Sequence, residues 1–376
     1  MTKVINNEQK FIIDSTRNKV RSSNIELYRI IIMLFIIAHH YVVNSGLITV
    51  IGESGYTNPN SLFLLFLGFG GKTGINCFVL ITGYYMCTSH IKLKKFIKLL
   101  FEVEFYKIMF YIIFLVSGYG EFSLKSCIKS LLPFYAINKN FVGCYLIFFC
   151  FIPFLNILIS NMKKYQHRYL MILCVITMSV FPTLKMNVVF SYVSWFMVIY
   201  IVGSYIRLYP SYWFDNKKIS IIFTILFLFI SLFTVMMGAI IAEDYGKEIY
   251  YYFVSDSNKL FALFLAISSF CLFKNITIRY NKFINIVARS CFGVLLIHTI
   301  NATMREWLWF DTLRNVSFYD SKYLVVHALL SVFGIYIICT LIDYIRIELF
   351  EKRYLILVDK VINSSTVNKY INIFKE

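Results

Sequence analysis

The chain alternates long apolar runs with short polar segments along most of its length. A membrane-spanning α-helix needs about 20 mostly apolar residues, whereas a strand of a membrane barrel needs only about 10 residues of alternating polarity. The apolar runs here are long and continuous, so the pattern predicts an all-α, polytopic membrane protein with about ten transmembrane helices. The expected helices are residues 25–51, 62–87, 99–116, 141–159, 169–181, 191–208, 219–242, 259–273, 290–307 and 323–345.

Composition and charge agree with a membrane location. Of the 376 residues, 59% are hydrophobic and 15% are charged, and the mean hydropathy is +0.69. Soluble domains have about 25% charged residues. The formal net charge is +17, but the basic residues are spread over many short loops and do not form one patch. We therefore expect no nucleic-acid partner.

The distribution of lysine and arginine predicts the orientation of the helices, because cytoplasmic loops of membrane proteins carry an excess of both residues. Most of them lie in both tails and in the loops after the second, fourth, sixth and eighth expected helices. The acidic loop 243–257 lies on the other side. Both termini are therefore expected in the cytoplasm. The bias toward Ile, Lys, Asn and Tyr is typical of an AT-rich bacterial genome, so a multi-pass protein of the bacterial plasma membrane is expected.

The pattern indicates one transmembrane domain with two tails. Residues 1–24 are polar and mixed in charge, so we interpret them as a cytoplasmic N-terminal tail and not as a cleavable signal peptide. Residues 25–346 form the transmembrane domain, and residues 347–376 form a basic cytoplasmic C-terminal tail. The nine cysteines show no CxxC spacing and lie mostly in apolar runs, so they are expected to be buried and structural.

The first apolar run contains ionisable residues at positions where they are costly. Residues 21–46 include Glu26, Arg29, His39 and His40, and ionisable groups at membrane depth usually mark a pathway or a reaction site. On an α-helix, Arg29 and His40 lie roughly 20° apart around the axis and about 16 Å apart along it. Glu26 lies near the same stripe, and His39 is rotated away by about 80–100°. This face is expected to form one wall of a polar cavity.

The other histidines are expected to have structural or solvated positions. His39 is interpreted as a packing neighbour, and His327, in the last expected helix, as structural. His90 and His167 lie in basic loops and are expected to be solvated. Adjacent histidines cannot both face one ion on a helix, and neither HxxxH nor HExxH occurs, so no metal site is expected.

Five motifs, in this order along the chain, resemble those of the acyltransferase 3 family of integral membrane acyltransferases. The first is an arginine and a histidine separated by ten residues, here Arg29 and His40. The other four are residues 74–86 (GINCFVLITGYYM, with Thr82 in place of the usual serine), the basic run 92–98, residues 141–156 (FVGCYLIFFCFIPFLN, preceded by Asn140 in place of the usual tryptophan) and residues 290–299 (SCFGVLLIHT, which contain His298). The resemblance covers about residues 21–346.

The resemblance implies a transfer reaction at a membrane. Members of the family move an acyl group, commonly acetyl from acetyl-CoA, to a hydroxyl of a carbohydrate or another cell-envelope molecule. Residues 25–346 would then form a transmembrane acyltransferase domain that contacts membrane lipid. Some relatives carry an extra hydrolase-like extracytoplasmic domain, for which the tail after residue 346 is too short. The protein is therefore expected to complete the transfer alone or to hand over to a separate extracytoplasmic transferase or hydrolase partner.

Acyl transfer from a thioester to an alcohol needs a base that takes the hydroxyl proton. A neutral histidine suits this role, because its ordinary pKa is about 6.5. We predict that His40 is this base or a transient acyl carrier. His298, from a different helix, is predicted to converge on the same site.

The phosphates of acetyl-CoA need positive charge. Arg29 is predicted to bind a donor phosphate or to orient Glu26. The basic run after the second expected helix is predicted to supply further donor contacts, although such a run is also a plain topology signal. Its candidate residues are Lys94, Lys95 and Lys98.

Two functions from other classes compete with the transferase interpretation. A flippase for lipid-linked sugars is expected to distribute charged residues over several helices and to show Gly- or Pro-broken helices in matching positions. A polysaccharide polymerase is expected to carry arginines in large outer loops. In this chain the ionisable residues of the apolar runs concentrate in the first run, and the outer loops are modest and arginine-poor. The ordered motifs favour the transferase.

Overall fold

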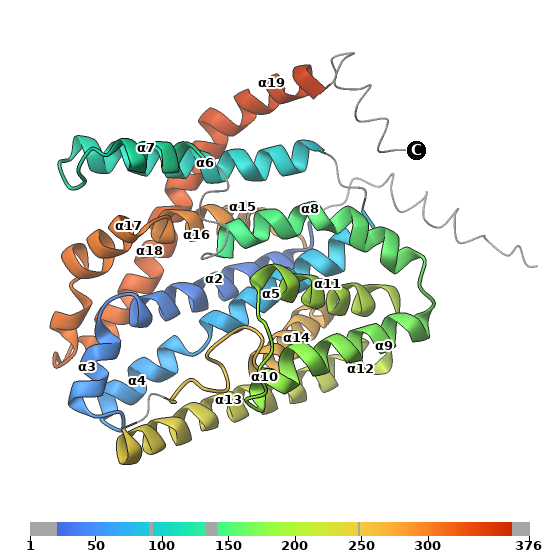
Figure 1. Cartoon of the computed structure of the whole chain (residues 1–376), viewed down its shortest axis with the longest axis horizontal. Helices are drawn as coiled ribbons and strands as arrows, with labels where there is room; N and C mark the ends of the chain where they lie inside the picture. The colour runs from blue at the N-terminus through green and yellow to red at the C-terminus, as the bar shows by residue number, and fades with distance from the viewer. Residues whose placement is uncertain (1–20, 90–92, 133–140, 247–248, 363–376) are drawn as a thin grey trace, which may run out of the picture.

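The computed structural model describes residues 21–89, 93–132, 141–246 and 249–362, and every regular element within these ranges is a helix (Figure 1). In chain order the elements are α2 (Ser23–Val43), α3 (Leu47–Ser54), α4 (Pro59–Gly68), α5 (Gly71–Met86), α6 (Leu93–Val116), α7 (Leu124–Leu131), α8 (Phe141–Ser160), α9 (Lys164–Val175), η1 (Ile176–Val180), α10 (Phe181–Thr183), α11 (Tyr192–Leu208), α12 (Tyr212–Asp215), α13 (Lys217–Tyr245), α14 (Leu260–Asn275), α15 (Lys282–Arg289), α16 (Cys291–Thr299), α17 (Ala302–Glu306), η2 (Trp307–Thr312), η3 (Asn315–Phe318), α18 (Leu324–Arg346), η4 (Ile347–Glu351) and α19 (Lys352–Ile362).

Six helical segments in the described part of the chain are long and apolar enough to cross a membrane. They are Ser23–Val43, Pro59–Met86, Phe141–Ser160, Lys217–Tyr245, Lys282–Thr299 and Leu324–Lys360. α11 and α14 are apolar but have only 17 and 16 residues, which gives them a length of about 25 Å against a hydrocarbon thickness of about 30 Å. The expected all-α membrane architecture is confirmed, whereas a count of ten spanning helices stays a prediction.

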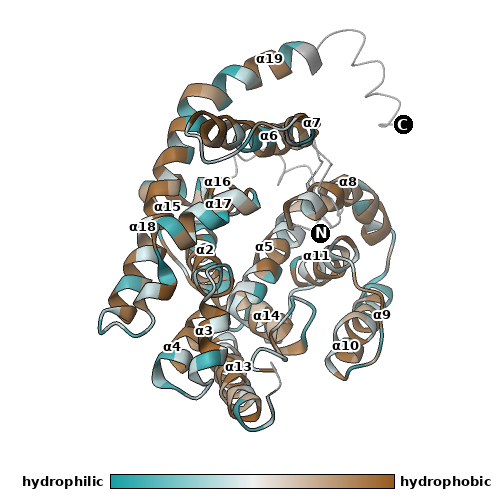
Figure 2. Ribbon diagram, turned by 60° about the vertical axis from the view of Figure 1, so that its left-hand side comes forward, coloured by the Kyte–Doolittle hydropathy of each residue, from teal (hydrophilic) through white to brown (hydrophobic). Residues whose placement is uncertain are grey.

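α2 lies at the centre of the helical assembly and positions the first motif. Its packing partners are α4, α5, α14, α15, α16 and α18. Figure 2 shows that peripheral helices such as α13 expose hydrophobic residues on their outer faces. Only 17% of the apolar window of α13 is buried, against 72% for the Pro59–Met86 segment. The outer helices therefore present apolar surface to lipid, while α2 and α5 are enclosed by protein.

Three runs that were expected to be continuous helices are broken in the structure. The first breaks between α2 and α3, where Gly46 adopts a left-handed φ of +80°. The second breaks between α4 and α5, before Gly71. The third breaks between α16 and α17, where the Asn301 side chain accepts a hydrogen bond from Met304 N at 2.7 Å and starts the new helix. The predictions of unbroken helices over residues 25–51, 62–87 and 290–307 were wrong at these points.

α5 and α11 cross at unusually close range through two glycines. A Cβ atom added to Gly203 would lie 2.8 Å from Leu80 O and 3.1 Å from Tyr84 N, and one added to Gly83 would lie 2.8 Å from Tyr200 O. These neighbours are backbone atoms, which cannot rotate away. Small residues allow helix backbones to approach in this way inside membranes. Gly83 belongs to the second motif, so the close crossing gives that glycine a physical reason.

A side chain at Gly203 is expected to push the two helices apart. We expect Gly203→Val to lower the free energy of unfolding by about 1–3 kcal/mol, the usual cost of overpacking. The measurement is an SDS titration of the purified protein followed by circular dichroism. Gly334→Val is the matched control, because nothing lies within 4 Å of a Cβ at Gly334 in α18. Equal effects of the two substitutions would contradict the role of the close crossing.

The prediction that His167 is solvated was wrong. The helix begins at Lys164, earlier than the expected start at residue 169, so His167 lies inside α9. Its ring is fully buried, and its Nε2 lies 3.0 Å from Ile201 O on α11. His327 has the expected structural environment, since its Nδ1 lies 2.8 Å from the Tyr41 hydroxyl. His90 lies outside the described residues.

The last helix continues beyond its expected end. α18 passes without interruption into η4 and α19, which reaches Ile362. A buried cluster of charges holds this extension against α6. Arg346 forms ion pairs with Glu102 at 3.0 Å, Asp343 at 2.8 Å and Glu351 at 3.0 Å. The first ten residues of the expected C-terminal tail are therefore packed helix.

Candidate functional site

Two histidines from opposite ends of the chain meet in the interior. His40 is near the end of α2, and His298 is near the end of α16. His40 Nδ1 lies 3.0 Å from His298 Nε2. His298 is fully buried, whereas His40 is partly exposed. The structure thus brings together the histidine of the first motif and that of the last motif, with only one of the two rings accessible.

A backbone carbonyl determines the hydrogen positions in this pair. His298 Nδ1 lies 2.5 Å from Val294 O, one turn earlier in α16. A carbonyl can only accept, so Nδ1 of His298 carries the hydrogen, and in a neutral ring its Nε2 is then an acceptor. His40 Nδ1 must therefore donate to His298 Nε2. The remaining nitrogen, His40 Nε2, keeps a free lone pair, which can take a proton.

The helix break between α4 and α5 makes room for the neighbouring His39. His39 Nδ1 lies 2.6 Å from Gly68 O, the last residue of α4. A Cβ atom added to Gly71 would lie 2.3 Å from the His39 ring. The imidazole therefore fills the gap that a side chain at Gly71 would occupy. This packing is the role that the sequence predicted for His39.

Three further polar residues gather where α5 and α11 begin and just before α14. Lys72 Nζ donates to the Tyr192 hydroxyl at 2.9 Å, and this hydroxyl donates to Asp256 Oδ1 at 2.9 Å. Lys72 Nζ also lies 3.9 Å from Asp256 Oδ1. We call these three residues the Lys72 cluster. Lys72 and the exposed Arg305 of α17 both act electrostatically on His40, so His40 lies in a positive environment.

Arg29 lies on α2 toward the opposite end of the helix from His40. Its guanidinium forms a loose ion pair with Glu26 at 3.8 Å, and Arg21 reaches the same carboxylate at 3.7 Å. The side chain is 31% exposed, yet its buried Nε has no hydrogen-bond partner. The structure places Arg29 and His40 apart, as their spacing requires, and leaves part of the guanidinium available to a ligand.

The basic run after the second motif contacts the C-terminal helices. Lys94 Nζ lies 2.6 Å from Asp359 Oδ2, and Lys98 Nζ lies 2.5 Å from Glu351 Oε1. Lys95 is exposed. Two of the three lysines predicted as donor contacts are thus engaged with carboxylates of this chain. The start of the run, Lys92, lies outside the described residues.

The second and fourth motifs contact each other, which explains their shared order along the chain. Thr82 Oγ1 lies 3.0 Å from the Tyr145 hydroxyl. The side-chain amide of Asn156, at the end of the fourth motif, donates to Met86 O at 3.0 Å and accepts from the Tyr200 hydroxyl at 2.5 Å. These bonds satisfy the carboxyl end of α5 and tie it to α8 and α11.

The analysis of the sequence missed the Lys72 cluster and Arg305. A signal existed for Lys72, because a lysine inside an apolar run is as costly as the ionisable residues of α2. Nothing in the sequence alone connects Tyr192 or Asp256 with it, since they come from distant segments. In the described part of the chain, no three His, Cys, Asp or Glu side chains come together in a way that could hold a metal ion.

Comparison with known proteins agrees with this arrangement of motifs. The acyltransferase domain model of the acyltransferase 3 family matches residues 22–344, a range that includes Arg29, His40 and His298. Comparisons with curated proteins and with solved structures gave no significant match. Because the family model covers most of the chain, the protein belongs to the acyltransferase 3 family of integral membrane acyltransferases.

Proposed function

We propose that the protein is an O-acetyltransferase that moves an acetyl group from acetyl-CoA to a hydroxyl of a cell-envelope carbohydrate. The observation that carries the proposal is the His40–His298 pair, which leaves one imidazole nitrogen free as a base. Family membership supports the reaction class. The proposed setting is a bacterial plasma membrane, with ten spanning helices and both termini in the cytoplasm, as the distribution of basic residues indicates.

The proposed step is a direct transfer. The acceptor hydroxyl oxygen attacks the thioester carbonyl carbon while His40 Nε2 takes the hydroxyl proton. The new C–O ester bond forms, the C–S bond breaks, and the departing CoA thiolate receives a proton from the imidazolium. His298 holds His40 in the productive tautomer through the bond to Val294 O. Lys72 and Arg305 supply positive charge, which favours the negatively charged tetrahedral intermediate.

The transfer is tested by the O-acetyl content of the envelope polysaccharide. Cells with the protein are expected to show acetyl ester signals in the NMR spectrum of the purified polysaccharide, and cells without it are expected to lack them. Complete acetylation in the absence of the protein, with a change in chain length or export, would contradict the transferase and favour a polymerase or a flippase.

Arg29 is proposed to bind a phosphate of acetyl-CoA, and the exposed Lys95 is proposed as a second contact. Hydrogen bonds to charged groups contribute about 1.5–3 kcal/mol. We therefore expect Arg29→Gln to raise the KM for acetyl-CoA by a factor of about 10 to 100 at a nearly unchanged kcat. The measurement is the initial rate in membrane vesicles. With S-acetylpantetheine, which lacks these phosphates, the substitution is expected to have no effect.

Arg21→Gln is the matched control for Arg29→Gln. Arg21 contacts the same Glu26 carboxylate at a similar distance but is the more exposed residue, at 47%. Its KM for acetyl-CoA is expected to stay within about twofold of the wild type, because exposed ion pairs contribute little. If Arg29→Gln impaired transfer from both donors equally, Arg29 would not act through the phosphates.

A further inference from the structure

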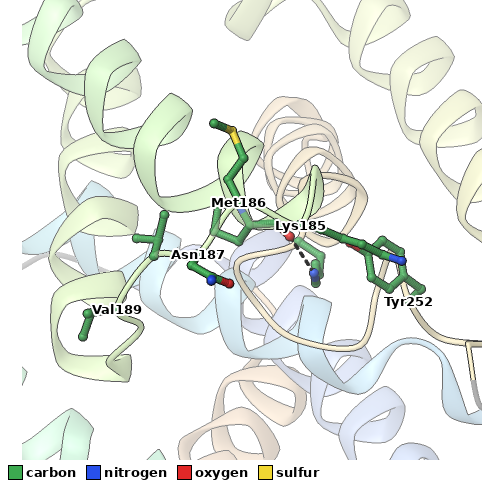
Figure 3. Close-up of a pocket in the computed structure, with 8 residues that line it drawn as sticks. Lys185, Met186, Asn187, Val189 and Tyr252 are labelled. Carbon is green, nitrogen blue, oxygen red and sulfur yellow. Dashed lines mark hydrogen bonds between the residues drawn. The ribbon is translucent and has the colours of Figure 1, made fainter.

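The described residues form an open groove away from the histidine pair. Residues 182 and 185–189, between α10 and α11, line one side, and Tyr252 and Lys259 line the other. The groove has a volume of about 480 Å³. Figure 3 shows that Lys185 and Tyr252 lie side by side at one end and that Val189 lies at the other. The two ends therefore differ in chemistry.

Hydrogen bonds between the two sides fix the shape of this groove. The Tyr252 hydroxyl donates to Thr183 O at 3.0 Å, and Lys259 Nζ donates to Pro182 O at 3.0 Å. Leu260 N donates to Thr183 Oγ1 at 3.1 Å. Thr183 is buried at the base of these contacts. The segment that follows α10 is thus anchored to the start of α14 and holds its side chains in place.

One end of the groove carries unbalanced positive charge. Lys259 Nζ lies 4.4 Å and Lys185 Nζ lies 5.4 Å from the centre of the Tyr252 ring. No carboxylate lines the groove, and the nearby Asp256 is engaged with Lys72 and Tyr192. Burial lowers the pKa of Lys259, and the charge of Lys185 lowers it further, although Asp256 opposes this. An anion at this end would relieve the repulsion.

The rest of the groove and its rim are apolar and exposed. Leu184, Met186 and Val189 are 67%, 52% and 93% exposed. Three large apolar side chains beside two lysines match a ligand with an anionic head and a hydrocarbon chain. A small hydrophilic anion would leave the apolar part of the groove uncovered.

We propose that this groove binds an anionic phospholipid, with its phosphate between Lys185 and Lys259 and its acyl chain along Met186 and Val189. Basic residues at a membrane surface attract anionic headgroups in this way. The proposal is independent of the acyl-transfer reaction, because it concerns residues outside the histidine site and is tested by binding alone.

The test is photolabelling of the purified full-length protein in neutral detergent. The probe is phosphatidylglycerol with a diazirine in its acyl chain, and labelled positions are mapped by mass spectrometry of peptides. Labelling is expected within residues 184–189, and unlabelled phosphatidylglycerol is expected to compete better than phosphatidylcholine. Lys185→Gln and Lys259→Gln are each expected to lower the labelling about fivefold. The same segment labelled equally in these variants would overturn the proposal.

Three further arms separate the alternatives. The double variant K185R/K259R keeps both charges and is expected to retain labelling, and its failure would show that lysine–tyrosine packing, not charge, maintains the site. Lys322→Gln is the matched control, since Lys322 lies 5.0 Å from the Tyr323 ring outside the groove, and it is expected to label like the wild type. Competition by glycerol 3-phosphate as strong as that by the lipid would overturn the assignment to a lipid.

Discussion

Replacement of His40 by alanine is expected to lower the rate of acetyl transfer by a factor of about 10² to 10⁴, the usual contribution of a general base. The physical reason is the hydrogen order of the His40–His298 pair, which leaves His40 Nε2 as the available base. The measurement is transfer of labelled acetyl from acetyl-CoA in membrane vesicles, at matched abundance of the protein. Because the donor contacts stay in place, the KM for acetyl-CoA is expected to change little.

Two companion variants sharpen this test. His298→Ala leaves the base but removes the partner of its Nδ1, so we expect a smaller loss of kcat than in His40→Ala. His327→Gln removes a histidine that contacts Tyr41 away from the pair, and its rate is expected to stay within about threefold of the wild type, since it makes no contact with the reacting groups. A rate for His40→Ala within tenfold of the wild type would exclude His40 as the base.

Replacement of Arg346 by glutamine is expected to lower the free energy of unfolding by about 3–5 kcal/mol, the cost of leaving buried charges without a partner. Arg346 is 3% exposed and contacts three carboxylates, those of Glu102, Asp343 and Glu351. Only Lys98 would remain to compensate them, through Glu351. The measurement is an SDS titration of the purified protein followed by circular dichroism.

Lys352→Gln is the control for this effect. Lys352 is paired with Glu348 one turn earlier but is 61% exposed, so its removal is expected to change the free energy of unfolding by less than about 1 kcal/mol. Adding Asp343→Asn to Arg346→Gln removes one of the uncompensated charges and is expected to restore part of the stability. Similar losses for Arg346→Gln and Lys352→Gln would show that the buried cluster is not a stabilising element.

The buried cluster also explains a residue of the last motif. A Cβ atom added to Gly293 would lie 2.2 Å from Asp343 Oδ1. That oxygen also accepts from the Tyr106 hydroxyl at 2.8 Å and from Arg346 Nε. The helix that carries His298 is therefore packed directly against the charge cluster. The glycine of this motif is needed because a charged side chain occupies the space of its Cβ.

The sequence by itself determined the helical membrane class, the family and the two motif histidines. These features are readable because a chain in lipid must satisfy its backbone hydrogen bonds within helices, so the length of each apolar run has a direct meaning. The spacing of Arg29 and His40 likewise follows from helix geometry alone. The site residues found in this way lie in single segments with an internal pattern.

Only the tertiary structure decided which segments meet and where helices break. His40 contacts His298 across 258 residues, and Lys72, Tyr192 and Asp256 come from three separate segments. The buried position of His167 and the ion pairs of Lys94 and Lys98 depend on packing against α11 and the C-terminal helices. The pattern within a segment records whether a residue is apolar, but its partner is selected by the fit between helices, which no single segment contains.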